Sequence, residues 1–371
     1  MRQRRTRYRK FWKTGKRKET NPTKIMDRSI IQAVDTMDMW GRVCSFPDQW
    51  QHALELSSEQ GFTFDRDRIR NVCIMGMGGS AIAGDLLRGY AAPVSPIPVM
   101  VNRQYKLPGW VGGNTLFIAS SYSGSTEETL EAFDKAKESG AQIVCMTSGG
   151  RLLEKAIECE CDYIRIPAGL SPRSALAYFF VPLYKMFIGL ELIKDDPSVC
   201  TSMPDFLKEQ VESFSDTDEN EPLYLAETIL DTLPVIYSNS GYLEAVNTRW
   251  RSQLAENAKI LSYGNVLPEM NHSEIVGWEQ MAHLTGRLSV FMLYDADDHE
   301  GIQSRMQVTR SLIQDHVVSL NTIAARGPNR LAKMFYLVQF GDFLSLYYAY
   351  LNETDPTPVT KIEMLKSRLM K

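Results

Sequence analysis

Short apolar runs alternate with helical stretches along most of the chain, and this alternation constrains the fold more than any other feature. The first half contains five such runs, at residues 71–76, 97–101, 115–120, 141–147 and 161–167. Similar runs follow in the second half, at residues 233–239, 287–294 and 316–321. Strands that alternate with helices favour βαβ units and parallel sheets. The sequence therefore predicts an α/β protein whose sheets are mainly parallel and flanked by helices.

A polar segment divides these runs into two groups. The chain has 371 residues, which is enough for two α/β domains with cores of their own. Residues 196–221 are rich in Asp, Glu, Ser and Pro, as expected for a crossing between domains. We therefore predict an N-terminal domain at 26–195 and a C-terminal domain at 222–351. A final segment, 352–371, contains one more short helix.

The first 25 residues differ from the rest in charge. Residues 1–24 contain eleven Lys or Arg and one acid, so the remaining chain carries a net charge of −14 although the whole chain carries −4. A signal peptide would need an apolar stretch after these charges, and none is present. We expect a disordered basic extension at 1–25, with a nucleic-acid-binding arm as the alternative. The acidic body argues against nucleic acid as the main partner, and no apolar run is long enough to span a membrane.

The six cysteines are scattered along the chain. Cys159 and Cys161 form a C-x-C pair, but no second pair or nearby histidine completes a zinc-like set. Free thiols are typical of a reducing cytoplasm, and we predict that location and no metal site.

A glycine-rich segment, MGMGGSA at 75–81, lies between the first apolar run and a helical stretch. Glycine lets the backbone approach an anion closely, and a helix N-terminus offers free N–H groups and a partial positive charge. The spacing also resembles a dinucleotide fingerprint, but the acidic residue that binds the ribose about 20 residues later is missing. At this point an anion site, a dinucleotide turn and a purely structural turn all remain open.

A second segment, SSYSGST at 120–126, follows the third apolar run and also precedes a helix. Its hydroxyls and N–H groups can bind the oxygens of a phosphomonoester. Helix capping is the alternative, although capping does not require so many hydroxyls. Parallel strands place both turns at the same edge of the sheet, where ligands bind.

Together, MGGS at 77–80 and SYSGSTEET at 121–129 resemble the sugar-isomerase (SIS) domains that bind phosphosugars. Later segments resemble one branch of them, the bifunctional phosphoglucose/phosphomannose isomerases, and the resemblance covers about residues 45–371. It implies two SIS-type domains. It also implies an enzyme that interconverts glucose 6-phosphate or mannose 6-phosphate with fructose 6-phosphate through a cis-enediol, without a metal ion or other cofactor.

The resemblance also implies roles for residues in the two turns. Gly79 and Ser80 are expected to line the sugar site. Ser121, Ser123 and Thr126 are expected to hold the phosphate.

Aldose–ketose isomerisation needs a base near C1 and C2, a group that stabilises the enediolate, and an acid or base for ring opening. From spacing alone, Glu256 is a carboxylate paired with Arg249, Arg251 or Lys259. The resemblance implies instead that Glu256 carries the proton between C1 and C2. It implies that Arg173, at the start of a helix, stabilises the enediolate.

Two further residues take roles from the resemblance. His272, in NHSEIVGWE at 271–279, is the implied proton donor for ring opening, and it enters the site from the neighbouring subunit of a homodimer. Lys366 on the last helix is implied to assist ring opening, with Lys361 as the alternative. The alternative function is that of a regulator that binds phosphosugars without catalysis. Such a protein would keep the two turns and lack the proton-transfer groups.

Overall fold

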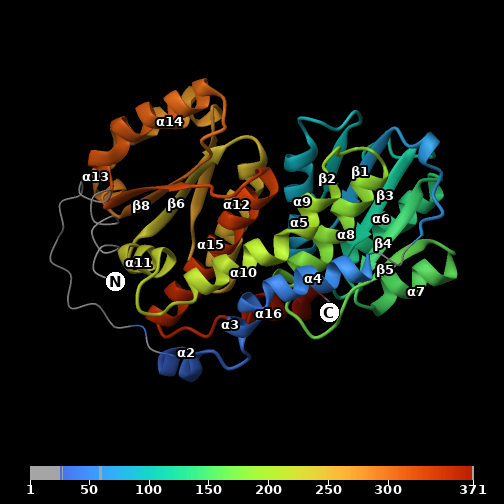
Figure 1. Cartoon of the computed structure of the whole chain (residues 1–371), viewed down its shortest axis with the longest axis horizontal. Coiled ribbons are helices and arrows are strands. Elements are labelled where there is room, and N and C mark those ends of the chain that lie inside the picture. The colour runs from blue at the N-terminus through green and yellow to red at the C-terminus, as the bar shows by residue number, and fades with distance from the viewer. Residues whose placement is uncertain (1–25, 27, 58–60, 370–371) are drawn as a thin grey trace.

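Two parallel β-sheets flanked by helices form the fold of residues 26, 28–57 and 61–369, which this computed structural model describes (Figure 1). The first sheet has the order β2-β1-β3-β4-β5, with β1 (Asn71–Met75), β2 (Val99–Asn102), β3 (Thr115–Ser120), β4 (Gln142–Thr147) and β5 (Asp162–Arg165). The second has the order β7-β6-β8-β9, with β6 (Leu233–Asn239), β7 (Tyr263–Leu267), β8 (Leu288–Tyr294) and β9 (Ser319–Ala324). Every strand pair is parallel. The predicted α/β class is confirmed, whereas the predicted basic extension lies outside the described residues.

Helices precede, connect and follow the strands. In the first half they are α2 (Arg28–Val34), α3 (Met39–Cys44), α4 (Phe46–Leu56), α5 (Gly78–Ala91), α6 (Glu127–Glu138), α7 (Gly150–Glu158) and α8 (Leu176–Gly189). In the second half they are α9 (Pro197–Thr201), α10 (Met203–Phe214), α11 (Glu221–Thr228), α12 (Tyr242–Glu256), α13 (Ala282–Thr285), α14 (Glu300–Ile313), α15 (Arg330–Leu351) and α16 (Thr360–Leu369). The short 3₁₀ helices are η1 (Arg66–Arg68), η2 (Pro172–Ser174), η3 (Glu269–His272), η4 (Glu274–Glu279) and η5 (Gln314–His316).

The central strands of the first sheet are buried on both faces. All six residues of β3 are buried, as are Val72 to Met75 of β1. This burial explains why the strands appear in the sequence as continuous apolar runs and not as alternating patterns. Each run must stop where the chain leaves the sheet, and β1 and β3 both lead into glycine-containing turns.

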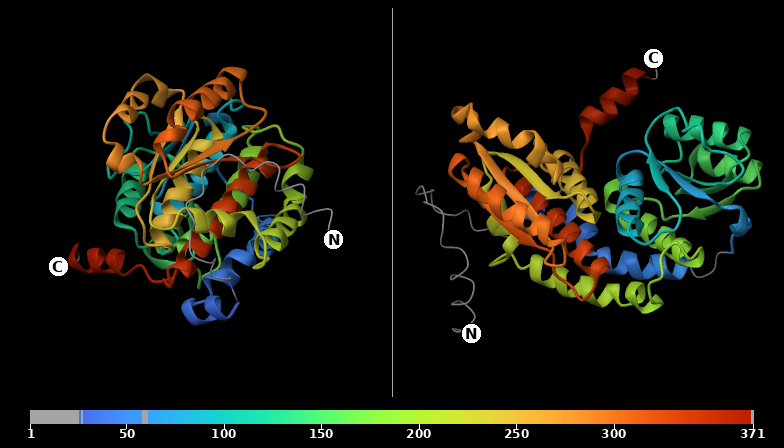
Figure 2. Two further views of the ribbon diagram at one scale, coloured as in Figure 1. Left: turned by 90° about the vertical axis from the view of Figure 1, so that its left-hand side faces the viewer. Right: turned by 90° about the horizontal axis from the view of Figure 1, so that it is seen from above.

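The two sheets lie at opposite ends of the molecule, and helices pack between and beneath them (Figures 1 and 2). Helix α12 packs against both α5 and α15, while α4 packs against α8 and α10. Nearly every residue of α15 is buried, so this helix belongs to the core and has no solvent face. None of the helices in the described part of the chain is long and apolar enough to cross a bilayer.

Several elements differ from the sequence prediction. Strand β7 was not predicted, because Gly264 and Asn265 have low strand propensity and β7 is a half-exposed edge strand. The polar crossing at 196–221 was expected to contain some helix, and it contains two helices, α9 and α10, in which several apolar residues are buried, among them Leu207. The predicted domain boundaries stay a prediction.

A buried ion pair joins α12 to α15. Arg249 donates to both carboxylate oxygens of Asp342, from Nε at 3.0 Å and from Nη2 at 2.6 Å. Gln253 donates to the same carboxylate at 2.8 Å, and Arg249 Nη2 also donates to the carbonyl oxygen of Arg173 at 3.1 Å. Because a buried carboxylate needs such partners, this cluster fixes the crossing of the two helices and the backbone at Arg173.

The Arg249→Met variant tests the importance of this ion pair. It leaves Asp342 buried without its cation, and we expect the free energy of unfolding to fall by about 3–5 kcal/mol, measured by urea denaturation. Arg151→Met is the matched control, because Arg151 forms surface ion pairs with Glu154 and Glu158, and little change is expected there. Similar losses in the two variants would show that the buried pair is not special.

Candidate active site

The two sequence-predicted turns lie side by side at the carboxyl ends of the neighbouring strands β1 and β3. Ser80, in the first turn of α5, connects them. Its carbonyl oxygen accepts a hydrogen bond from Ser120 Oγ at 3.0 Å, and its own hydroxyl accepts one from the backbone N–H of Tyr122 at 3.0 Å. The N-termini of α5 and α6 therefore lie side by side, and their free N–H groups can bind an anion there.

The serine-rich turn before α6 is built around a glycine with left-handed backbone. Gly124 has φ 65°, and a Cβ there would stand 1.8 Å from the carbonyl oxygen of Gly149, so no side chain fits. Its N–H donates to Ser121 Oγ at 3.1 Å, and that hydroxyl bonds Thr126 Oγ1 at 2.8 Å. Thr126 occupies the N-cap position, but its side chain makes no capping bond. Helix capping therefore does not explain why a hydroxyl is present at position 126.

The first turn packs closely against the segment that carries Arg173. A Cβ at Gly79 would stand 2.7 Å from the carbonyl carbon of Pro172 and 2.8 Å from the nitrogen of Arg173. Only glycine permits this approach, and it brings η2 directly against the start of α5. Because of this close packing, the turn that contains Gly79 and the segment that carries Arg173 form one continuous surface.

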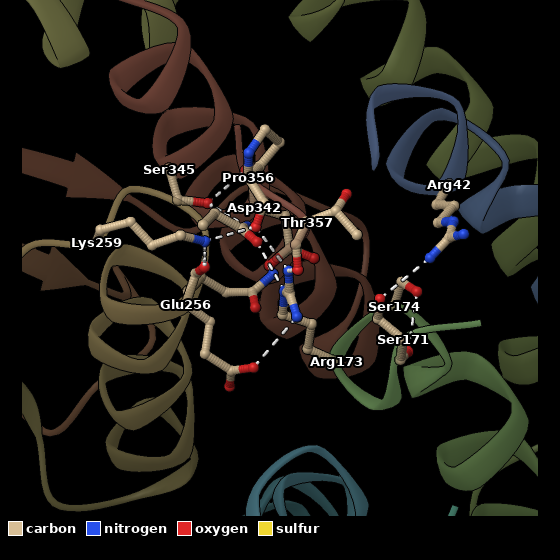
Figure 3. Close-up of polar contacts among 12 residues, drawn as sticks. Arg42, Ser171, Arg173, Ser174, Glu256, Lys259, Asp342, Ser345, Pro356 and Thr357 are labelled. Atoms are coloured by element: carbon tan, nitrogen blue, oxygen red, sulfur yellow. Dashed lines mark hydrogen bonds and ion pairs between the residues drawn. The ribbon is translucent and has the colours of Figure 1, made fainter. Parts of the chain in front are cut away.

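Four acceptors hold the buried guanidinium of Arg173 (Figure 3). Its Nε donates to Asn257 Oδ1 at 2.8 Å, and its Nη2 donates to the carbonyl oxygens of Pro356 at 2.8 Å and Thr357 at 3.2 Å. Its Nη1 donates to Glu256 Oε2 at 3.3 Å. Burial lowers the pKa of Arg173, and the carboxylate of Glu256 opposes that shift. Since a guanidinium has five N–H groups, one N–H on Nη1 is left without a partner among the described residues.

Glu256 is the last residue of α12, and its side chain is 27% exposed. Its carboxylate pairs with Arg173 and not with the three cations that spacing suggested. Arg249 pairs with a carboxylate of α15, Arg251 donates to side chains on its own helix, and Lys259 donates to the backbone carbonyl of Glu256. The carboxylate thus forms an ion pair with Arg173 and stays partly open to solvent.

His272 does not lie with these residues. It is exposed at the end of η3, next to the edge strand β7 of the second sheet, and its imidazole forms no hydrogen bond with any of the described residues. Nearby Glu274 accepts hydrogen bonds from Tyr237, from Tyr263 at 2.6 Å and from Asn265 at 2.5 Å. These bonds fix η4 to the sheet and hold the loop that presents the imidazole.

Lys366 is also separate from the site. It lies on α16, which has no buried residue and projects from the rest of the fold (Figure 2). Lys361 lies on the same helix. Within the described part of the chain, neither lysine forms an ion pair or a hydrogen bond through its side chain.

Three contributors to the site were missed from the sequence. Asn257, which is fully buried, accepts from Arg173 and donates to Ser345 Oγ at 3.0 Å. Its position directly after Glu256 was the available signal. The carbonyl groups of Pro356 and Thr357 gave no signal, because every residue has a carbonyl group.

The corresponding edge of the second sheet carries a buried carboxylate. After β8, Asp295 accepts hydrogen bonds from Tyr242 at 2.5 Å and from Lys333 at 2.6 Å. A carboxylate at this sheet edge would repel a phosphate. The two sheets are therefore similar in architecture and differ in chemistry.

The comparisons with known proteins agree with this division into two parts. Residues 68–156 match the SIS domain family, and residues 218–369 match the family described as bacterial phospho-glucose isomerase C-terminal SIS domain. Among solved structures, tagatose-6-phosphate ketose/aldose isomerase from Escherichia coli superposes with a TM-score of 0.65 at 14% identity, over 84% of this chain and 92% of that one. That similarity concerns the fold alone.

Two curated relatives are similar over nearly their whole length, and both are named bifunctional phosphoglucose/phosphomannose isomerase. The protein of Caldicellulosiruptor bescii is 42% identical over 334 residues, which are 89% of this chain and 98% of the relative. The protein of Thermoplasma acidophilum is 37% identical over 333 residues, which are 86% and 98% of the two chains. With two SIS-type domains and relatives at this level of identity, the chain belongs to the bifunctional phosphoglucose/phosphomannose isomerase family.

Proposed function

We propose that this protein is an aldose–ketose isomerase that interconverts glucose 6-phosphate and mannose 6-phosphate with fructose 6-phosphate. One observation carries the proposal: an unbroken series of contacts runs from the serine turn through Ser80 and Gly79 to Arg173 and Glu256. A phosphate on the turn would place its sugar beside the carboxylate and the guanidinium. Family membership supports the same reaction.

The phosphate is proposed to bind the hydroxyls of Ser121, Ser123 and Thr126 together with the N–H groups at the start of α6. The first N–H groups of a helix have no partner within it and favour an anion. Gly79 and Ser80, at the start of α5, are proposed to line the sugar. This arrangement holds the end of the substrate that does not react, and so fixes C1 and C2.

Glu256 is proposed to remove the proton from C2 of the aldose and return it to C1. The negative charge that develops on the enediolate oxygen would be stabilised by Arg173, whose partnerless Nη1 N–H is available for it. This chemistry requires no metal ion, because the guanidinium supplies the positive charge. The enediol is planar at C2, so return of the proton to either face of C2 yields glucose or mannose 6-phosphate.

A homodimer is proposed to complete the site. His272 is exposed, and the surrounding segment also exposes large apolar side chains, namely Leu261, Tyr263, Val276, Met281 and Leu284. Such a patch is typical of an interface. In this dimer His272 would enter the partner's site and assist ring opening, and Lys366 is proposed to assist the same step.

The cytoplasm is the proposed location. All six cysteines are free, as in proteins of reducing compartments. Phosphorylated hexoses, the proposed substrates, suit the same location.

Glu256→Gln tests the proposed base. It keeps the size of the side chain and removes the base, so kcat for fructose 6-phosphate should fall by about 10²–10⁴-fold. Fructose 6-phosphate binding, measured by calorimetry, should persist. Glu244→Gln, on the first turn of the same helix, is the control and should keep full turnover. If Glu256→Gln turns over at the wild-type rate, Glu256 is not the base. If the unaltered protein binds the sugar phosphate but never isomerises it, the protein is a regulator.

Thr126→Val tests the phosphate site. The substitution preserves shape and removes one hydroxyl, so KM should rise by about tenfold, the usual cost of a hydrogen bond to a charged group. Ser139→Ala, at the other end of α6, removes a hydroxyl that donates to a backbone carbonyl, and it should leave KM unchanged. Equal KM values in all three proteins would place the phosphate elsewhere.

Mixing two inactive variants tests the shared site. In a dimer of Glu256→Gln and His272→Ala subunits, one site carries both defects and the other carries neither. Random exchange of subunits should therefore restore about a quarter of wild-type activity. If each site used the Glu256 and His272 of one chain, the mixture would stay inactive.

A further inference from the structure

Two cations hold the C-terminal segment against the site. Lys259 Nζ donates to the carbonyl oxygen of Glu256 at 2.5 Å and to that of Pro356 at 2.8 Å. The Pro356 carbonyl also accepts from Arg173 Nη2 at 2.8 Å. Figure 3 shows Lys259 and Arg173 meeting at this one carbonyl. A single main-chain oxygen is thus shared by the two cations, and Lys259 joins it to the end of α12.

Lys259 adopts a left-handed backbone conformation just after α12. Its φ is 59°, a left-handed conformation that side chains other than glycine disfavour. The chain adopts it just beyond α12, where the N–H of Ile260 donates back to the carbonyl of Leu254 at 3.3 Å. Six other non-glycine residues in the described part of the chain also have positive φ, so this conformation belongs to the helix end, and the case for a role rests on the contacts of the ammonium.

Three charged groups face the Lys259 ammonium: Arg173 from η2, Glu256 from α12 and Asp355 from the C-terminal segment. Burial and the nearby guanidinium of Arg173 lower the pKa of Lys259 to about 8, against the opposing effect of the two carboxylates. The group therefore carries its charge at neutral pH and loses it under mildly alkaline conditions.

We propose that Lys259 is a positioning residue of the isomerase site, whose ammonium ties the Pro356 carbonyl to the end of α12 and so aligns Glu256 with Arg173 and the segment leading into α16. The inference rests on the proposed isomerase function. It concerns a residue that does not touch the substrate and acts through Glu256 and Arg173.

A pH dependence follows from this role. Below pH about 8 the ammonium attracts both carbonyl oxygens, and above it the neutral amine holds them less strongly. Turnover should therefore decline on the alkaline side. An arginine at 259 would stay charged over the whole range and so move that decline to higher pH.

The experiment compares three variants with the wild-type protein, using fructose 6-phosphate from pH 6.5 to 9.5. Lys259→Met should lower kcat/KM at pH 7 by about tenfold or more, as expected for a misplaced reacting group. Lys259→Arg should recover most of that loss and move the alkaline decline to higher pH. Lys137→Met is the matched control, because Lys137 also donates to a backbone carbonyl, that of Cys159 at 3.1 Å, and it should behave as wild type.

Each outcome decides the matter. Wild-type activity of Lys259→Met across the pH range, or an Arg variant that keeps the wild-type alkaline decline, overturns the inference. If Lys259→Met does not fold, the Arg profile alone decides. An inactive wild-type protein would overturn the proposed function itself, which is a separate result.

Discussion

The anchoring of one guanidinium organises the site of this protein. Arg173 is buried, and its partners come from α12 and from the chain that follows α15. Its own backbone is held by Arg249 and pressed against Gly79. Because a buried cation must satisfy its N–H groups, segments far apart in sequence are drawn to one point. These contacts hold the two halves of the fold in a defined geometry at the site.

The two halves of the fold use the same architecture differently. In the first sheet the carboxyl edge has glycine and hydroxyl groups and free helix N-termini, which suit an anion. In the second sheet the corresponding edge holds Asp295 between Tyr242 and Lys333, and the helix α12 contributes a carboxylate at its far end instead. In the proposed mechanism, phosphate binding therefore belongs to the first half and proton transfer to the second.

Much of the fold was predictable because the central strands are buried on both faces and their apolar runs stand out. The edge strand β7 escaped prediction, since its Gly264 and Asn265 gain strand structure only from pairing with β6. The two turns were predictable from glycine and serine spacing, and their adjacency followed from parallel topology. The approach of Arg173 to Glu256 was implied only by the family resemblance, because the two are 83 positions apart and their contact depends on how α12 packs. His272 and Lys366 stand apart from that contact, and a single chain does not bring them to it.

The C-terminal segment is gripped through its main chain, at the carbonyls of Pro356 and Thr357. These hydrogen bonds do not depend on which side chains the segment carries, because every residue has a carbonyl oxygen. The Thr357 side chain is nearly buried, and its hydroxyl has no partner among the described residues. Because the hydrogen bonds to Arg173 use main-chain oxygens, the side chain at position 357 can change without loss of those bonds. Within the proposed site, the main chain can thus stay fixed while the side chains that it carries vary.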